Sequence, residues 1–255
     1  MRYRFFLSFL GSSYFGMQRQ KGKATVQQKV EETLSSLTGE DIEIKYSGRT
    51  DAGVSAAAMP AAFSCARELD CPRMESLLNR RLPKDIAVFG LENCDDSFKP
   101  RQDSVGKRYS YTFSLKRKFP LRCHSCAYLG DYDLDLGLLK KALDCFKGTH
   151  DFSNFTSKEE DVGGFVRTIY SIEVLQDDGA YRVEIVGDGF MTYQIRLMMG
   201  YAIRVGIGRS SLDELKAALE RKPRLVTHYK APAEGLCLEE VYYDENEFLL
   251  SHPHP

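Results

Sequence analysis

The chain has 255 residues, of which 43% are hydrophobic and 28% are charged, and its formal net charge is −1. This balance excludes a disordered chain, suits one large domain or two packed halves, and disfavours a uniformly basic nucleic-acid-binding protein. No apolar run approaches the roughly 18 residues that cross a bilayer, and the apolar patch at the start lacks the long core and cleavage site of a signal peptide.

The first part of the chain alternates short apolar strands with two amphipathic helices. RYRFFLSFLG at 2–11 indicates a buried strand. TVQQKVEETLSSLTG at 25–39 has apolar residues at helical spacing, with Thr25 as a typical N-cap and Gly39 as a typical stop. DIEIKYSG at 41–48 alternates like a strand and leads into a loop of small residues. The sequence then predicts a helix at 71–83 and strands at 85–93 and 107–115.

The second part repeats this style. An amphipathic helix is predicted at 135–148, closed by its terminal glycine. Residues 168–189 contain two strands joined by an Asp-Asp-Gly turn, which indicates a hairpin. Two further helices are predicted at 191–208 and at 211–222, with Ser211 as the cap of the second, and a last strand at 236–243.

This element order predicts an α+β protein with a mixed, mostly antiparallel sheet from two similar halves flanked by helices. We expect an N-terminal half at 1–104 and a C-terminal half at 105–255. No linker rich in Pro, Gly or Ser separates the halves, so we expect one continuous sheet and one continuous unit.

Basic residues are concentrated in two stretches. Residues 98–122 contain eight basic residues and one acidic residue, and residues 196–224 contain seven basic and three acidic residues. Acidic residues gather elsewhere, as at 158–161 and 242–247. Segregated basic stretches can follow a phosphate backbone, and the alternative is an ordinary solvated surface.

The seven cysteines are an odd number without framework spacing, which indicates a reduced, cytoplasmic protein. Cys123, His124 and Cys126 form one CHSC stretch. A single C-x-x-C without a second pair is weak evidence for a metal site, so we expect no metal.

YSGRTDAGVSA at 46–56 places one carboxylate, Asp51, among small residues. Small neighbours allow a planar ligand to approach the backbone closely, and Arg49 and Thr50 can position the carboxylate or a phosphate. A carboxylate beside an arginine stays ionised, which suits a nucleophile or an electrostatic stabiliser. The alternative is a structural turn, since Gly, Asp and Thr are common in loops.

GRTDAGVSA resembles the active-site motif of the tRNA pseudouridine synthase A (TruA) family. Other stretches resemble the same family in the same order and span nearly the whole chain: YFGMQRQ (14–20), LPKDIAV (82–88), KRYSY (107–111), HDFSNF (150–155), DGFMTYQIRLMMG (188–200) and APAEGLCLEEVYY (231–243). The resemblance implies the pseudouridine synthase fold with a central basic cleft, a homodimer, and tRNA as the partner, at positions 38 to 40 of the anticodon stem-loop.

The resemblance also implies roles for four residues. Asp51 matches the nucleophilic aspartate, and Tyr109 matches the aromatic residue that stacks against the target uracil. Arg196 matches the arginine that pairs with the aspartate, and because its helix is largely apolar we expect a buried Arg196–Asp51 pair. Arg49 matches an arginine implicated in flipping the base and holding RNA.

The implied reaction breaks the N-glycosidic bond of uridine, turns the uracil and rejoins it through carbon. No electrons or energy enter, so we predict no cofactor. Asp51 either attacks the sugar or abstracts a proton beside it, and the sequence leaves both routes open. Unstacking the uridine costs a few kcal/mol, and stacking on Tyr109 returns about 1–3 kcal/mol. The alternative for Tyr109 is a plain core role.

Two positions depart from the family pattern: Met17 stands where the family has tryptophan, and Ser55 where it has histidine or a similar polar residue. The stretch AAAMPAAF after the motif is also less polar than in the family. Three other readings therefore stay open. The same chemistry can act on another tRNA site or another RNA, the chain can be a non-catalytic RNA-binding protein, or CHSC can mark a metalloenzyme.

Overall fold

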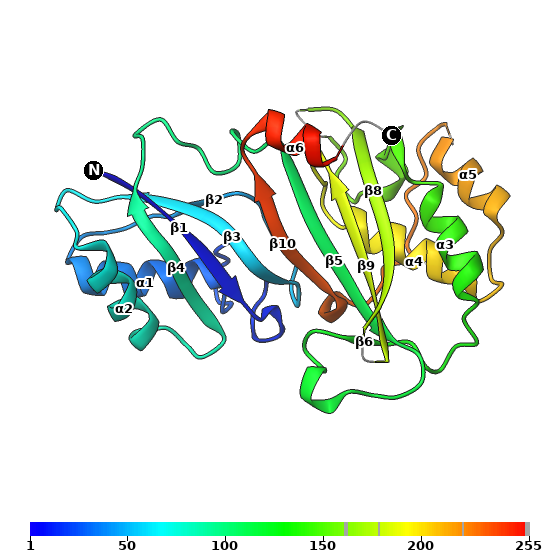
Figure 1. Cartoon of the computed structure of the whole chain (residues 1–255), viewed down its shortest axis with the longest axis horizontal. Coiled ribbons are helices and arrows are strands. Elements are labelled where there is room, and N and C mark those ends of the chain that lie inside the picture. The colour runs from blue at the N-terminus through cyan, green and yellow to red at the C-terminus, as the bar shows by residue number, and fades with distance from the viewer. Residues whose placement is uncertain (161–162, 178, 221, 253–255) are drawn as a thin grey trace. The chain divides into compact units, whose positions relative to one another are not determined.

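The computed structural model describes residues 1–160, 163–177, 179–220 and 222–252, and it divides into two compact units (Figure 1). Unit 1 comprises Met1–Ser104 and Cys237–Tyr243. Unit 2 comprises Val105–Leu236 and Asp244–Pro255. A segment near the C-terminus therefore completes the sheet of the N-terminal unit.

Unit 1 contains a mostly antiparallel sheet in the order β4-β1-β3-β10, with the short β2 also paired to β3. β1 pairs with β3 and β4 in antiparallel register, whereas β10 runs parallel to β3, with Cys237 opposite Ser55. Its strands are β1 (Arg2–Phe9), β2 (Lys45–Tyr46), β3 (Ser55–Ser64), β4 (Ile86–Asn93) and β10 (Leu236–Tyr242).

The helices of unit 1 confirm the sequence prediction. α1 (Val26–Thr38) begins at Thr25, whose hydroxyl accepts a hydrogen bond from the Gln28 N–H, and ends at Gly39 in a left-handed conformation. α2 (Cys71–Arg81) begins at Asp70, whose carboxylate accepts from the Arg73 N–H. A single 3-10 turn, η1 (Gly11–Ser13), follows β1.

The strand predicted at 41–48 is wrong over most of its length, because only Lys45–Tyr46 is paired. The alternation is real, since Ile42 and Ile44 are buried. Their N–H groups, however, donate to the Ser35 hydroxyl and the Glu31 carboxylate on α1. Side chains of a helix thus take the place of a neighbouring strand here.

β3 was not predicted, although it is the strand that β1, β2 and β10 all pair with. Its alanines have low strand propensity, and Pro60 cannot donate to a ladder. Met59, Ala61, Ala62 and Phe63 are nevertheless buried. Burial, and not the strand propensity of its residues, therefore marks this strand.

Unit 2 contains an antiparallel path β5-β9-β8-β7, with β6 parallel to β5. The hairpin predicted at 168–189 is confirmed by β8 and β9, whose register shifts between Ile169 and Ser171. The strand bounds are β5 (Gly106–Ser114), β6 (Ala127–Tyr128), β7 (Gly148–Asp151), β8 (Val166–Asp177) and β9 (Ala180–Gly187).

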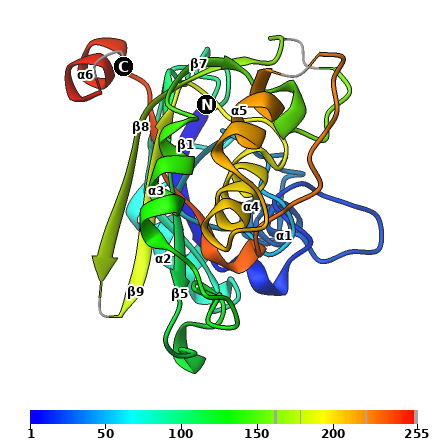
Figure 2. The ribbon, with the colours of Figure 1, turned by 90° about the vertical axis from the view of Figure 1, so that its right-hand side faces the viewer.

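Helices α3, α4 and α5 lie together on one side of the unit 2 strands (Figure 2). α4 was predicted to begin at residue 191 but begins three residues later, at Gln194. Tyr193 has a φ of 63° and interrupts the helical backbone before that point. Ser211 caps the start of α5, as predicted, because its hydroxyl accepts from the Glu214 N–H. The Glu214 carboxylate accepts from the Ser211 N–H in return, which completes a capping box that was not predicted from the sequence. The helices and 3-10 turns are η2 (Pro120–Arg122), α3 (Leu136–Asp144), η3 (Ser153–Phe155), α4 (Gln194–Gly206), α5 (Leu212–Glu220), η4 (Ala233–Gly235) and α6 (Glu245–Ser251).

The predicted fold class is confirmed: the chain is α+β, with mixed, mostly antiparallel strands and flanking helices. Within the described ranges, no helix combines the length and the apolar character that a membrane span requires.

Candidate active site

Asp51 lies in the loop that connects β2 to β3 in unit 1. At the start of this loop, the Ser47 N–H donates to the Pro60 carbonyl of β3 (3.0 Å). At its end, the Val54 N–H donates to the Asp51 carbonyl (3.1 Å), which closes a tight turn directly before β3. Asp51 is half-buried and Arg49 is exposed. The carboxylate is therefore carried by a short loop that is fixed to the central strand of its unit.

A second segment, residues 11–17, forms a seat under the Asp51 loop. The Met17 N–H donates to the Thr50 carbonyl (3.3 Å), and the Gly53 N–H donates to the Tyr14 carbonyl (3.4 Å). The backbone is thus held on both sides of Asp51. The sequence marked 14–20 as a separate motif, and the structure places part of it against the Asp51 motif.

Glycines allow the loop and its seat to approach this closely. A Cβ on Gly16 would overlap the Thr50 carbonyl oxygen and stand 3.2 Å from the Asp51 carbonyl carbon. A Cβ on Gly11 would overlap the Val54 carbonyl. Because backbone atoms cannot yield as a flexible side chain can, both positions require glycine if the loop is to keep its place.

The two departures from the family pattern, Met17 and Ser55, are both buried and both belong to this contact. Met17 is 0% exposed. The Ser55 hydroxyl accepts a hydrogen bond from the Gly11 N–H (3.0 Å) and is 5% exposed. Each residue therefore influences Asp51 through the position of the loop and its seat.

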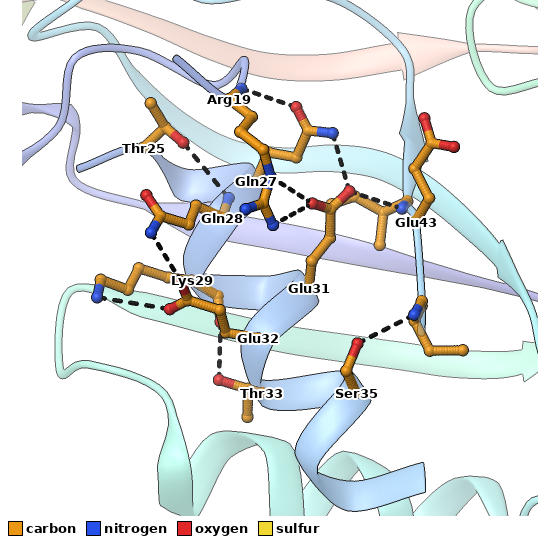
Figure 3. Close-up of polar contacts among 12 residues, drawn as sticks. Arg19, Thr25, Gln27, Gln28, Lys29, Glu31, Glu32, Thr33, Ser35 and Glu43 are labelled. Atoms are coloured by element: carbon orange, nitrogen blue, oxygen red, sulfur yellow. Dashed lines mark hydrogen bonds and ion pairs between the residues drawn. The ribbon is translucent and has the colours of Figure 1, made fainter. Parts of the chain in front are cut away.

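A buried carboxylate on α1, Glu31, joins Arg19, two residues after the seat, to the segment that leads into the Asp51 loop (Figure 3). One oxygen accepts from the Arg19 guanidinium (2.7 Å), and the other accepts from the Gln27 side-chain amide (2.8 Å) and the Ile44 N–H (3.0 Å). The Gln27 side-chain oxygen Oε1 in turn accepts from the Arg19 backbone N–H (2.8 Å) and the Tyr46 hydroxyl (3.3 Å). Glu31 is only 5% exposed, so these partners compensate for its burial.

In unit 2, Arg196 lies in the first turn of α4 and is half-buried. Its Nε donates to the Ala231 carbonyl (2.9 Å), and the Ala231 N–H donates to the Arg196 carbonyl (2.9 Å). The Tyr193 ring lies 5.6 Å from the Arg196 guanidinium carbon and 4.1 Å from Lys230 Nζ. Two cations thus lie near the ring of Tyr193. The backbone of Tyr193 is in a left-handed conformation.

Tyr109 lies on β5, opposite Ile185 of β9, and is 8% exposed. Its ring meets the edge of Phe190 at a centroid distance of 5.3 Å and an interplanar angle of 79°. Phe190 follows directly on the turn that leaves β9. The sequence did not identify this aromatic partner.

Asp188 occupies the same turn. One carboxylate oxygen accepts from the Thr168 N–H (3.0 Å), and the Asp188 N–H donates to the Thr168 carbonyl (3.1 Å). The other oxygen, Oδ1, is buried without a hydrogen-bond partner in the described residues. Burial raises the pKa of this carboxyl above its usual range, and the N–H groups of Thr168 and Gly189 and the charge of Arg167 oppose the rise.

The CHSC stretch splits between environments, with Cys123 exposed and Cys126 buried. All seven cysteines are free thiols. Over the ranges that the structure describes, no three His, Cys, Asp or Glu side chains form a group that could hold a metal ion.

The structure places the four predicted site residues in two pairs. Asp51 and Arg49 belong to the same loop of unit 1, and Tyr109 and Arg196 belong to unit 2. Sequence reasoning missed two residues near these pairs: Glu31, which binds the Ile44 N–H ahead of the Asp51 loop, and Tyr193, whose ring lies near the Arg196 guanidinium. The sequence did contain a signal for Glu31. Glu31 directly follows Val30, which belongs to the apolar stripe of α1, so its side chain lies at the edge of the buried face of the helix.

Comparison with known proteins identifies the family. The model of a family described as tRNA pseudouridine synthase matches residues 6–101 and 142–244, which include the Asp51 loop, its seat and Arg196. The chain belongs to the tRNA pseudouridine synthase family. It is therefore an isomerase that converts uridine to pseudouridine in tRNA.

Curated members of this family are similar over almost their full length. A tRNA pseudouridine synthase A of Clostridium kluyveri is 37% identical over 93% of this chain and 97% of that protein. One of Staphylococcus aureus strain Newman is 35% identical over 95% of this chain and 91% of that protein. Among solved structures, one titled as an H/ACA RNP bound to a substrate RNA containing 2'-deoxyuridine aligns with a TM-score of 0.40 and 14% identity, over 95% of this chain and 50% of that chain.

Proposed function

We propose that this enzyme isomerises uridines at positions 38 to 40 of the tRNA anticodon stem-loop, with Asp51 as the catalytic carboxylate. The observation that carries the proposal is the Asp51 loop itself. The family match covers it, and hydrogen bonds from the seat hold its backbone on both sides of the carboxylate. A catalytic group needs this kind of fixed position, since a misplacement of about 1 Å can cost 100-fold in rate.

The reaction is an isomerisation in which every bond broken is replaced. The N1–C1′ bond of uridine breaks, the uracil turns, and a C5–C1′ bond forms while C5 loses a proton and N1 gains one. Asp51 begins this sequence by attacking the sugar or by removing a proton beside C1′. Because no electron is transferred overall, we expect the enzyme to act without a cofactor or a metal.

The other three site residues act on the uridine and on Asp51. The uridine leaves its stack at a cost of a few kcal/mol. Stacking on Tyr109 returns about 1–3 kcal/mol of this cost. Arg196 pairs with Asp51, and the exposed Arg49 holds the RNA and the flipped base. We further propose that the enzyme is a homodimer and that it is cytoplasmic.

The proposal is tested by mapping pseudouridine in total RNA from cells that lack the gene. The deletion is complemented with the wild type, with Asp51→Asn, and with Asp41→Asn, which changes an exposed aspartate of the same unit. We expect loss at positions 38 to 40, restored by the wild type and Asp41→Asn but not by Asp51→Asn.

Other outcomes assign other functions. Loss at different uridines would keep the chemistry and move it to another tRNA site or another RNA. Full restoration by Asp51→Asn would contradict a catalytic Asp51. If no site is lost and no second enzyme compensates, the chain is an RNA-binding protein, and purified Asp51→Asn would bind tRNA as tightly as the wild type.

A further inference from the structure

A loop that projects from unit 2 carries cations that the site does not use. Residues 115–126 connect β5 to β6 and extend away from the strands of their unit (Figure 1). The base of the loop is fixed, because Phe113 and Ser114 pair with Ala127 and Tyr128. The Ser114 hydroxyl also donates to the Arg117 carbonyl (2.9 Å). The loop is thus presented from a rigid base.

Four cations lie within seven residues of this loop. Lys116, Arg117 and Lys118 are exposed, and Arg122 is half-exposed. No acidic residue occurs from 104 to 130. In the described part of the chain, none of the four cations forms an ion pair with a carboxylate. Gly179, in the turn between β8 and β9, adjoins the Phe119 ring.

Aromatic rings hold three of these cations. The guanidinium carbons of Arg117 and Arg122 lie 4.5 Å and 5.6 Å from the centre of the Phe119 ring. Lys118 Nζ lies 5.2 Å from the centre of the Tyr128 ring. A guanidinium that rests on a ring keeps its N–H donors for other partners and loses less rotamer freedom when it binds.

The chemistry of the loop selects one kind of partner. The cations of the loop can bind phosphate groups, and its aromatic rings can stack against bases. An RNA strand carries both kinds of group. Leu121, in the same loop, is 102% exposed and offers an apolar contact as well. The family model matches 6–101 and 142–244, so the loop lies outside both matched ranges and is not explained by the shared active site.

We propose that residues 116–122 bind the sugar–phosphate backbone of the RNA substrate outside the uridine site, and that they supply affinity and not chemistry. This inference rests on the proposed function, because it takes tRNA as the substrate. Arg117 and Arg122 form the centre of the contact, since Phe119 holds both guanidinium groups.

The test compares Arg117→Gln/Arg122→Gln with Lys140→Gln/Lys141→Gln, which removes the same charge from exposed positions of α3 in the same unit. The Kd for an unmodified tRNA transcript is measured between about 50 and 200 mM salt, values chosen for the steep dependence of phosphate contacts. Each lost contact lowers the slope of log Kd against log salt by about 0.7–0.9. We expect a slope lower by about 1.5 and binding about 10- to 50-fold weaker for the loop variant. The α3 variant should stay within about twofold of the wild type.

Single-turnover pseudouridine formation separates affinity from chemistry. At saturating enzyme, the loop variant should reach the wild-type rate, with a half-saturating concentration raised in step with its Kd. Arg117→Lys/Arg122→Lys, which keeps the charge, should retain the wild-type slope. A lower saturated rate would contradict the proposal, because the loop would then take part in the chemical step.

Three results distinguish the possible failures. If the wild type forms pseudouridine but the loop variant keeps its Kd and slope, the loop proposal is wrong and the proposed function stands. If the wild type forms no pseudouridine in tRNA, the proposed function itself fails. If the loop variant binds tRNA more weakly and also has a lower molar mass than the wild type in light scattering, the loop joins copies of this chain. That result would overturn the proposed RNA contact.

Discussion

A Cβ on Gly16 would overlap the carbonyl oxygen of Thr50, the residue before Asp51. The Gly16→Ala variant should therefore displace the Asp51 loop from its seat. Gly16 also has a φ of 87°, which costs an L-residue about 1–2 kcal/mol. We expect kcat for pseudouridine formation to fall by about 100-fold or more, while the protein still folds.

Gly22→Ala provides the matched control for this prediction. Gly22 has a φ of 72°, but a Cβ there would meet nothing within 4 Å. It should lose similar stability in urea unfolding and keep its kcat within about threefold. Equal losses of kcat in the two variants would show that backbone strain, and not the position of the Asp51 loop, limits the activity.

Glu31 should act on catalysis from a distance, because its carboxylate binds Arg19, Gln27 and Ile44 together. Glu31→Gln leaves Arg19 without its counter-charge and changes one acceptor into a donor. A hydrogen bond to a charged group is worth about 1.5–3 kcal/mol, and the half-exposed Arg19 side chain places the loss near the lower end. We expect a lower Tm together with a lower kcat at saturating tRNA.

The control for Glu31 is Glu32→Gln, one position along the same helix. Glu32 is exposed and lies 3.7 Å from Lys29, a surface pair worth at most about 0.5 kcal/mol. It should leave both Tm and kcat unchanged. If Glu31→Gln lowers Tm but not kcat, the cluster stabilises unit 1 without positioning the Asp51 loop.

The sequence predicted elements well where hydrophobic periodicity and capping agreed. α1 and α5 begin near the expected residues because Thr25 and Ser211 make the predicted caps. β3 was missed because its alanines gain their stability from burial, and the neighbours that bury them are distant in sequence. Tertiary context decided this strand, and local propensity did not.

The candidate site was predicted as residues but not as an arrangement. The Asp51 motif was recognisable from its order of residue types. Its seat depends on the backbone of Gly16 approaching that of Thr50 across 34 positions of the chain, and no local pattern encodes such an approach. The delayed start of α4 has a similar cause, since the left-handed Tyr193 is held by Lys230 from another segment.

Arg196→Lys should be far more damaging than Arg204→Lys on the same helix. Both arginines rest near a tyrosine ring and donate from Nε, Arg196 to the Ala231 carbonyl and Arg204 to the Ser210 hydroxyl. The planar guanidinium group of arginine can donate one hydrogen bond from Nε while its other N–H groups bind a second partner. The ammonium group of lysine cannot reproduce this geometry. We expect kcat/KM to fall by about 100-fold or more for Arg196→Lys and by less than about threefold for Arg204→Lys. Similar losses in both would assign Arg196 a structural role only.

We expect the contribution of Asp188 to the free energy of unfolding to decrease as the pH rises. Burial raises the pKa of its carboxyl in the folded state, so the folded protein holds this proton more tightly than the unfolded chain does. The associated stabilisation is complete below about pH 4, the usual carboxyl range. This stabilisation is lost as the pH rises through the pKa of Asp188 in the folded state. Each tenfold difference in proton affinity between the folded and unfolded states contributes about 1.4 kcal/mol to the free energy of unfolding. Relative to the wild type, Asp188→Asn should therefore be more favourable at pH 7 than at pH 4.

Asp151→Asn should show the opposite trend and serves as the control in the same unit. Burial acts to raise the pKa of Asp151, but Lys222 and the Ser153 donors outweigh it and hold the pKa below its usual range. Its stabilisation is present above the usual carboxyl pKa and is lost as the pH falls through the lowered value. Urea unfolding of the wild type and both variants from pH 4 to pH 7, about the range where carboxyls titrate, measures the two differences. Differences that stay constant with pH would show that neither carboxyl has a shifted pKa, and a shared sign would show that Asp188 is stabilised as a carboxylate after all.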